Sequence, residues 1–217
     1  MNRILFVAAG AVLIAAFFIG SWYYKTERAE ELGSMAQEQA SIFVRPHSPM
    51  LGSEDAKVTL VKFSDPACET CASFSPFVKQ ALANFPGQLK LVLRYASFHE
   101  GSENVVRILE AARKQGKFWE TLELLYKRQN VWTLHHRVIL SEVWPLLPEV
   151  GLDVERVRMD MQDQKIAAVI EQDLADAETL GVRKTPGFFV NGKSLQPFGA
   201  RPLAALIKAE IRANYPE

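Results

Sequence analysis

Residues 63–71 of the chain read Phe63-Ser64-Asp65-Pro66-Ala67-Cys68-Glu69-Thr70-Cys71. The run before this motif, residues 57–63, is rich in β-branched and apolar side chains, which predicts a strand. The run after it, residues 71–84, repeats apolar residues at helical spacing. The two cysteines, which are the only ones among the 217 residues, therefore stand where a strand passes into a helix.

Two thiols at this spacing are suited to reversible disulfide exchange. A thiolate at Cys68 would lie beside the unpaired N–H groups and the positive end of the helix dipole, which lower its pKa. Cys71 would lie one turn further along, where it could attack a mixed disulfide held on Cys68 and release the partner. Half of a metal site and two inert thiols remain as other interpretations. A zinc site needs two further ligands, and the four histidines show no matching spaced pair.

The composition excludes several classes of function. Hydrophobic residues make up 48% of the chain and charged residues 23%, so we expect neither a disordered chain nor a polytopic membrane protein. The formal net charge is zero, and no basic patch stands out, so we expect no nucleic-acid partner. Two cysteines cannot build a disulfide-rich scaffold or a four-thiolate zinc site, and we expect no metal and no organic cofactor.

The amino terminus has the length and composition of a membrane anchor. No charged residue lies between Ile4 and Tyr24. At a rise of about 1.5 Å per residue, this run reaches about 30 Å, the thickness of a bilayer's hydrocarbon core. We expect residues 1–24 to form an uncleaved transmembrane helix; a cleaved signal is the alternative. Residues 25–52 are polar and then irregular, which predicts a linker or stalk.

The remaining sequence predicts one α/β domain interrupted by helices. Residues 89–95 form a second strand, and helical spacing continues through residues 101–181. An apolar strand then leads to Asn191-Gly192, a strong hairpin signal. The strands on either side of the helical block are too few for a sheet unless they join each other. We therefore assign residues 53–217 to one α/β domain with a helical subdomain inserted at about residues 101–181.

Thr185-Pro186 precedes the apolar strand of the hairpin. A proline that enters a sheet strand from a loop is a candidate for a cis peptide bond. Taken together, the cysteine motif, the helical block and the segment 181–192 resemble the DsbA-like family of thioredoxin-fold thiol-disulfide oxidoreductases. The resemblance covers about residues 56–214 and implies a thioredoxin-like fold and a protein disulfide oxidoreductase.

The same resemblance implies roles for individual residues. Cys68 would be the attacking thiol, Cys71 the resolving thiol and Pro186 the cis-proline that faces them, while Thr185 would offer its backbone to a bound substrate chain. The implied substrates are cysteine-containing secreted or envelope proteins, and a redox partner in the membrane is compatible with them. The implied location is a bacterial inner membrane with a single pass and the catalytic domain in the periplasm, where disulfides persist.

Two positions depart from the family pattern. Glu69-Thr70 stands between the cysteines, where many relatives have a proline-containing pair, and a carboxylate beside Cys68 opposes thiolate formation. This indicates a milder oxidant. Lys62 stands six residues before Cys68, where relatives often carry a buried acid. Its amine either faces the thiols and stabilises the thiolate, or extends to solvent.

The sequence leaves the direction of catalysis open between oxidase, reductase and isomerase. It also leaves open a second function: a tethered, non-enzymatic protein-binding or chaperone module whose disulfide is structural. Three histidines carry little weight for catalysis. We expect His99 in a loop or capping role, and His135 and His136 on a solvated helix face.

Overall fold

The computed structural model describes residues 41–216. The chain divides into two units, Met1–Phe43 and Val44–Glu217. The expected transmembrane anchor, residues 1–24, and the first part of the expected linker lie outside the described residues. None of the helices within residues 41–216 combines the length and the hydropathy that a membrane span requires.

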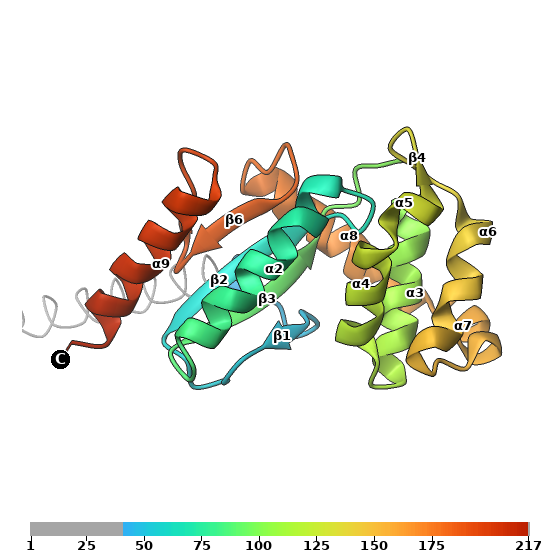
Figure 1. Cartoon of the computed structure of the whole chain (residues 1–217), viewed down its shortest axis with the longest axis horizontal. Coiled ribbons are helices and arrows are strands. Elements are labelled where there is room, and N and C mark those ends of the chain that lie inside the picture. Colours follow the sequence, from blue (N-terminus) through green and yellow to red (C-terminus); the bar gives the residue numbers. More distant parts are fainter. Residues whose placement is uncertain (1–40, 217) are drawn as a thin grey trace, which may run out of the picture. The chain divides into compact units, whose positions relative to one another are not determined.

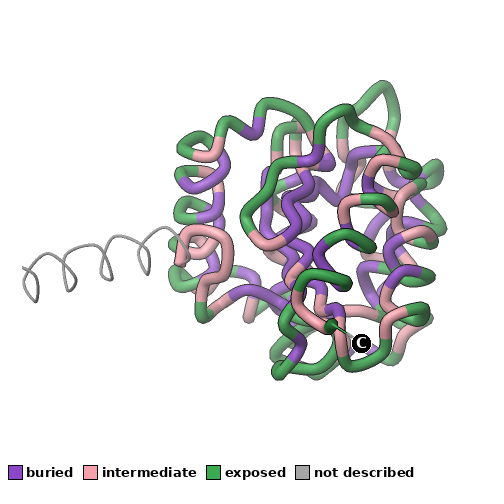
Figure 2. The backbone as a smooth tube through the Cα atoms, turned by 90° about the vertical axis from the view of Figure 1, so that its left-hand side faces the viewer, coloured by how far each residue is buried: buried purple, intermediate pink, exposed green. Residues whose placement is uncertain are grey.

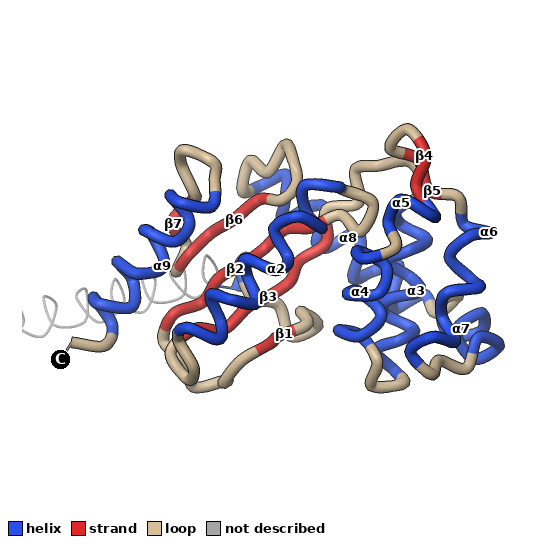
Figure 3. The backbone as a smooth tube through the Cα atoms, viewed as in Figure 1, coloured by secondary structure: helices blue, strands red, loops and turns tan. Residues whose placement is uncertain are grey.

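A five-stranded sheet forms the centre of the second unit (Figure 1; strands red in Figure 3). Its strands, in spatial order, are β1 (Met50–Leu51), β3 (Leu89–Tyr95), β2 (Val58–Ser64), β6 (Gly187–Val190) and β7 (Lys193–Ser194). β2 runs parallel to β3, and the other neighbouring pairs are antiparallel. Since β2 pairs with β6, the strands before and after the helical block do join in one sheet. The expected α/β domain, with one sheet joined across a helical block, is thus observed.

The β6–β7 hairpin turns at the Asn191-Gly192 pair that the sequence indicates. Both residues have positive φ, 47° for Asn191 and 79° for Gly192, as a two-residue turn between twisted strands requires. The pairing of β6 with β2 places Phe188 opposite Lys62 and Gly187 opposite Phe63. The loop that ends at Pro186 is thereby held beside the end of β2.

Helices cover both faces of the sheet (Figure 1). On one face lie α2 (Glu69–Asn84) and α9 (Ala200–Asn214). They bury an apolar cluster against β2, β3 and β6, whose fully buried members include Val58, Leu60, Val190, Leu203 and Ile207. The residues of β2 alternate between the two faces, so Lys62 lies on the same face as Leu60, beneath α2. On the opposite face, α8 (Gln164–Thr179) contacts β3.

The inserted subdomain is helical, as expected. Its elements are α3 (Ser102–Lys114), α4 (Phe118–Lys127), α5 (Gln129–Trp132), the short hairpin β4 (Thr133–Leu134) and β5 (Arg137–Val138), α6 (Leu140–Val143), a 3₁₀ helix (Trp144–Val150) and α7 (Val154–Asp160). Among residues 41–216, Figure 2 shows the buried positions concentrated in the strands and on the inward sides of the helices. Trp132, Ile108, Leu125 and Leu147 are fully buried in the core that this subdomain shares with Cys71.

The folded unit begins earlier than residue 53. β1 pairs with β3 through Met50 and Val92, and Arg45 forms an ion pair of 2.7 Å with Asp176 of α8. Residues 44–52, which the sequence analysis assigned to the linker, therefore belong to the domain. They are attached by a two-residue strand and by polar contacts. Neither the short strand nor the polar contacts produce a periodic pattern of apolar residues, which is the signal from which the start of a domain is predicted.

The placement of His135 and His136 on a helix face is wrong. The two residues form the turn of the β4–β5 hairpin, with φ angles of 50° and 62°. Such a turn is usually made by Asn or Gly, and histidine gives no sequence signal for it. The sequence therefore predicts helix at the residues that form this short hairpin.

Candidate active site

Cys68 is the N-cap residue of α2. Its backbone is extended, with φ −79° and ψ 117°, and its sulfur accepts a hydrogen bond from the backbone N–H of Cys71 at 3.3 Å. The turn before the helix is fixed by Asp65, whose carboxylate accepts from the N–H of Ala67 at 2.8 Å and whose carbonyl accepts from the N–H of Cys68 at 3.1 Å. The helix dipole and its free N–H groups therefore act on the Cys68 sulfur, as the sequence predicts.

The loop at Thr185 faces this sulfur. The Thr185–Pro186 peptide bond is cis, as expected from the sequence. The Cys68 thiol donates to the carbonyl oxygen of Thr185 at 3.3 Å, across 117 residues of sequence. A pocket of about 510 Å³ opens beside them; it is lined by Thr70, Thr185, Pro186 and apolar side chains that include the half-exposed Phe198.

The surroundings of Cys68 favour its thiolate. The hydrogen bond from the Cys71 thiol, together with those from the Thr185 side chain and the Cys71 backbone, lowers the pKa of Cys68 to about 6 from an ordinary value of 9.0. Burial acts in the opposite direction, and the charge of His99 adds to the lowering. Near neutral pH, Cys68 is therefore mainly the anion, which is the nucleophilic form of cysteine.

Cys71 has the opposite character. Its side chain is fully buried, and this burial, with the nearby Cys68, raises the pKa of Cys71 far above its ordinary value. Lys62 and the hydroxyl of Ser64 act against this rise. Cys68, which is 6% exposed, is thus ionised, whereas the fully enclosed Cys71 is protonated, the division that the motif's position on the helix indicates.

Lys62 faces the site and does not extend to solvent. The residue is 2% exposed, and its Nζ donates to the carbonyl oxygen of Cys71 at 3.0 Å. The Nζ also lies 5.1 Å from the centre of the Tyr126 ring. Burial lowers the pKa of Lys62, whereas the charges of Cys71 and Cys68 raise it. Of the two orientations considered from the sequence, the structure has the one directed at the thiols.

Glu69 and Thr70 are both exposed at the first turn of α2, so the dipeptide between the cysteines faces outward. Glu69 is the acidic residue of that turn, where a carboxylate also interacts favourably with the helix dipole. Among residues 41–216, no group of three or more His, Cys, Asp or Glu side chains is placed to hold a metal ion.

Sequence reasoning missed Asp65 and underrated His99. The buried Asp65 carboxylate accepts from the backbone N–H of His99 at 2.8 Å and from the Ser102 hydroxyl at 3.2 Å. Asp65 follows β2, and His99 comes soon after β3. Since parallel strands end at the same edge of a sheet, the two residues could have been placed together at the carboxyl ends, where α/β sites form.

The thioredoxin family model matches residues 45–209, which include the cysteine motif, the helical insertion and the cis-proline loop. The chain belongs to the thioredoxin family. Within that family, its structural neighbours are DsbA-like proteins, as the sequence resemblance implies, and the expected enzyme class, thiol-disulfide oxidoreductase, is confirmed.

Three solved structures illustrate this relationship. A thioredoxin-like oxidoreductase from Silicibacter pomeroyi is 29% identical, with a TM-score of 0.69 over 80% of this chain and 96% of that one. BdbD from Bacillus subtilis is 25% identical, with a TM-score of 0.68 over 76% and 93%. The thiol-disulfide exchange protein α-DsbA2 from Wolbachia pipientis is 18% identical, with a TM-score of 0.66 over 84% and 97%. The last of these shows the shared fold alone.

Curated relatives of this thioredoxin-family chain are much longer proteins named as Na⁺/H⁺ antiporters. One from Herminiimonas arsenicoxydans is 30% identical over 214 residues, which cover 95% of this chain but 34% of that protein. Another, from Salinispora tropica, is 28% identical over 170 residues, which cover 74% and 25%. This chain thus spans about a third or less of their length, and the names describe those whole proteins.

Proposed function

We propose that the pair Cys68 and Cys71 exchanges disulfides with cysteine-containing proteins through a mixed disulfide on Cys68. One observation carries this proposal. The Cys68 sulfur caps α2, ionises with a pKa of about 6 and meets the carbonyl of Thr185, while Cys71 stays buried and protonated behind it. A structural disulfide needs no such division between an ionised and a protonated sulfur.

The exchange has two steps. The Cys68 thiolate attacks one sulfur of a substrate disulfide, so that a Cys68–substrate bond forms and the other substrate sulfur leaves as a thiolate. The Cys71 thiol then loses its proton and attacks the Cys68 sulfur, which releases the second substrate sulfur and leaves a Cys68–Cys71 disulfide. Two electrons pass from the protein to the substrate. Run in reverse, the same steps deliver a disulfide, and the reduction potential of the pair sets the direction.

The cis-proline loop offers the place for the substrate chain. Thr185 already brings its backbone within hydrogen-bond distance of Cys68, and the pocket of about 510 Å³ lies along Thr185 and Pro186. A chain held against this loop would present its sulfur to Cys68. Thr70, which also lines the pocket, would contact the residues beside the substrate cysteine.

The setting follows from the amino terminus. Residues 4–24 would anchor the chain in a bacterial inner membrane with the catalytic domain in the periplasm, where it meets secreted and envelope proteins and a membrane redox partner. Fractionation of cells should recover the chain in the membrane, and protease added from the periplasmic side should cut the domain. A soluble mature protein that begins near Trp22 would support the cleaved signal instead.

Cysteine variants test the chemistry. With Cys71→Ser, mixed disulfides between Cys68 and partner proteins should accumulate, because the resolving thiol is absent; with Cys68→Ser they should not form. Turnover of a disulfide-containing peptide by the unmodified chain, in the presence of glutathione, completes the test. Equal trapping by both variants would overturn the assignment of roles. A lack of turnover would favour the non-enzymatic binding module.

A further inference from the structure

The loop that ends at the cis-proline carries two cations without a partner. Arg183 and Lys184 directly precede Thr185, and both residues are exposed. Within residues 41–216, neither side chain forms an ion pair or a hydrogen bond. Two positive charges are therefore available at the place where the substrate chain would lie.

Both cations line the pocket of about 510 Å³ that opens beside Cys68. All of its lining residues belong to the described part of the chain, and none of them is Asp or Glu. Much of the remaining wall is apolar. The half-exposed Phe198 contributes to it and packs against Phe188, with 6.4 Å between the ring centres. The pocket thus combines an apolar surface with two charges that its own wall does not neutralise.

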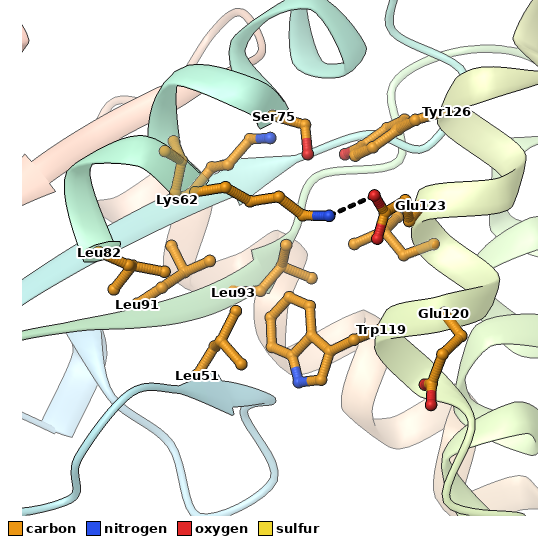
Figure 4. A pocket seen from close by; sticks show the side chains of 13 residues that line it. Leu51, Lys62, Ser75, Leu82, Leu91, Leu93, Trp119, Glu120, Glu123 and Tyr126 are labelled. Atoms are coloured by element: carbon orange, nitrogen blue, oxygen red, sulfur yellow. Dashed lines mark ion pairs between the residues drawn. The ribbon is translucent and has the colours of Figure 1, made fainter. Parts of the chain in front are cut away.

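The other pocket near the thiols has a different charge balance. It measures about 210 Å³ and lies between α2 and α4 (Figure 4). Its lining includes Glu120 and Glu123 as well as Lys79. Lys79 forms an ion pair with Glu123, marked by the dashed line in Figure 4. A lysine of that pocket therefore has its counter-charge in the same wall, whereas the charges of the cis-proline pocket can be neutralised only by a bound ligand or by ions from solvent.

We propose that the cis-proline pocket selects substrate segments that carry an acidic side chain near the reactive cysteine. The inference rests on the proposed function of the cysteine pair. The Thr185 carbonyl lies 3.3 Å from the Cys68 sulfur, so a chain held against the loop has its cysteine beside Thr185. An extended chain rises about 3.3 Å per residue. A carboxylate one to three residues from that cysteine can therefore reach Arg183 or Lys184.

The selectivity should be modest and mainly kinetic. An exposed ion pair strengthens an interaction by about fivefold at most, because water and salt weaken it. Complementary charges at the rim of a binding site act chiefly on the rate of encounter. The guanidinium of Arg183 can also hold a carboxylate through two parallel hydrogen bonds. We therefore expect acidic segments to form the mixed disulfide with Cys68 faster, and salt to reduce this advantage.

Three peptides test the selectivity. Each has one cysteine and one phenylalanine in an otherwise identical sequence, with Glu, Gln or Lys placed two residues to either side of the cysteine. Each peptide is joined to a second copy of itself by a disulfide, and the full reduced chain is the reductant. Acid quenching and chromatography measure the released peptide thiol. Every rate is divided by the rate at which dithiothreitol reduces the same dimer, because flanking charges alter attack by any thiolate.

At low ionic strength, the normalised rates should fall in the order Glu, Gln, Lys, with the Glu dimer about fivefold faster than the Gln dimer. In about 0.5 M salt, the three rates should converge, because exposed charges are then screened within a few ångströms. Reduction of the Gln dimer tests the proposed function alone. Reduction of none of the dimers would overturn that function, whereas equal normalised rates for all three would overturn only the selectivity.

Charge reversal assigns the selectivity to the two cations. In the double variant Arg183→Glu, Lys184→Glu, the Lys dimer should become the faster substrate. The ratio between the Glu and Lys dimers is compared within each variant, so a change in the reactivity of Cys68 itself cancels. Lys208→Glu reverses an exposed charge on α9 outside the pocket lining and should keep the ratio of the unmodified chain. A ratio that is unchanged in the double variant, or that falls equally in Lys208→Glu, would overturn the proposal.

Discussion

The Oδ2 atom of Asp65 lies 2.7 Å from Nδ1 of His99, so a buried carboxylate at the end of β2 holds an imidazole that follows β3. The His99 charge lowers the pKa of Cys68. The dipeptide between the cysteines, Glu69-Thr70, contains no imidazole, so the imidazole near Cys68 comes from the residues that follow another strand.

Replacing His99 should weaken the Cys68 thiolate. His99→Asn keeps a side-chain donor toward Asp65 and removes the charge, so the pKa of Cys68 should rise. The rise should be smaller than that caused by Cys71→Ala, because the Cys71 thiol is the main cause of the lowered pKa. Thiolate absorbance against pH measures both. His135→Asn, in the exposed β4–β5 turn, should leave the curve unchanged. An unchanged curve for His99→Asn as well would remove His99 from the site.

The pH dependence of alkylation should separate the two thiols. Since the pKa of Cys68 is about 6, its reaction with iodoacetamide should rise with pH through about 6 and level off by pH 8. Cys71 should stay unmodified in the folded protein, because burial raises its pKa and encloses its sulfur. Peptide mass spectrometry assigns the modified residue. Alkylation of Cys71 before Cys68 would contradict the division between them.

The same pKa carries a consequence for stability. The folded pKa of Cys68 lies below its ordinary value of 9.0, so the folded, reduced protein has released a proton that the unfolded chain still holds between about pH 6 and 9. The contribution of Cys68 to stability therefore grows as the pH rises across this window, and it is lost as the pH falls through about 6. Comparison of the reduced protein with Cys68→Ser in urea isolates this contribution.

Much of the fold could be predicted from local patterns. The Asn191-Gly192 turn and the strand alternation are short-range signals that depend on two to seven neighbouring residues. The pairing of β2 with β6 could be predicted because the strands on either side of the helical block are too few to form a sheet unless they join each other. The attachment of residues 44–52 could not be predicted, because it rests on contacts between residues far apart in sequence. The β4–β5 turn could not be predicted because its two histidines give no turn signal.

The residues of the candidate site also divide into those that local sequence predicts and those that it does not. Cys68, Cys71 and Pro186 were predicted because spacing and junctions encode them. The orientation of the Lys62 side chain could not be predicted. An amine at this strand position can turn toward the thiols or toward solvent, and the packing beneath α2 decides between the two orientations. The link from Asp65 to His99 spans 34 residues and required knowing that β2 and β3 are parallel neighbours.

A buried ionic cluster under β3 should carry a large share of the stability. Arg94 is fully buried, and its guanidinium pairs with Asp173 at 2.7 Å and with Asp176. The Asp173 carboxylate also accepts from the backbone N–H of Tyr95 at 2.7 Å. Asp173→Asn removes one counter-charge from an enclosed cation and should lower the free energy of unfolding by about 3 kcal/mol. Urea denaturation measures this, with the exposed Glu171→Gln on the same helix as control. A loss below about 1 kcal/mol would show that Asp176 alone suffices.

The charge of Glu69 should tune the redox couple. Whatever stabilises the Cys68 thiolate favours the reduced form and makes the disulfide a stronger oxidant. Glu69 is exposed at the first turn of α2, beside that sulfur, so its carboxylate opposes the anion. Glu69→His removes this charge and can add a positive one; a shift of one pKa unit is worth about 1.4 kcal/mol, or about 30 mV for a two-electron couple. We therefore expect a lower Cys68 pKa and a reduction potential raised by tens of millivolts.

Equilibration with glutathione measures the potential, and Glu171→His on α8 makes the same charge change away from α2. An unchanged or lower potential for Glu69→His would mean that the dipeptide does not set the redox poise, and the inference of a milder oxidant would fall with it.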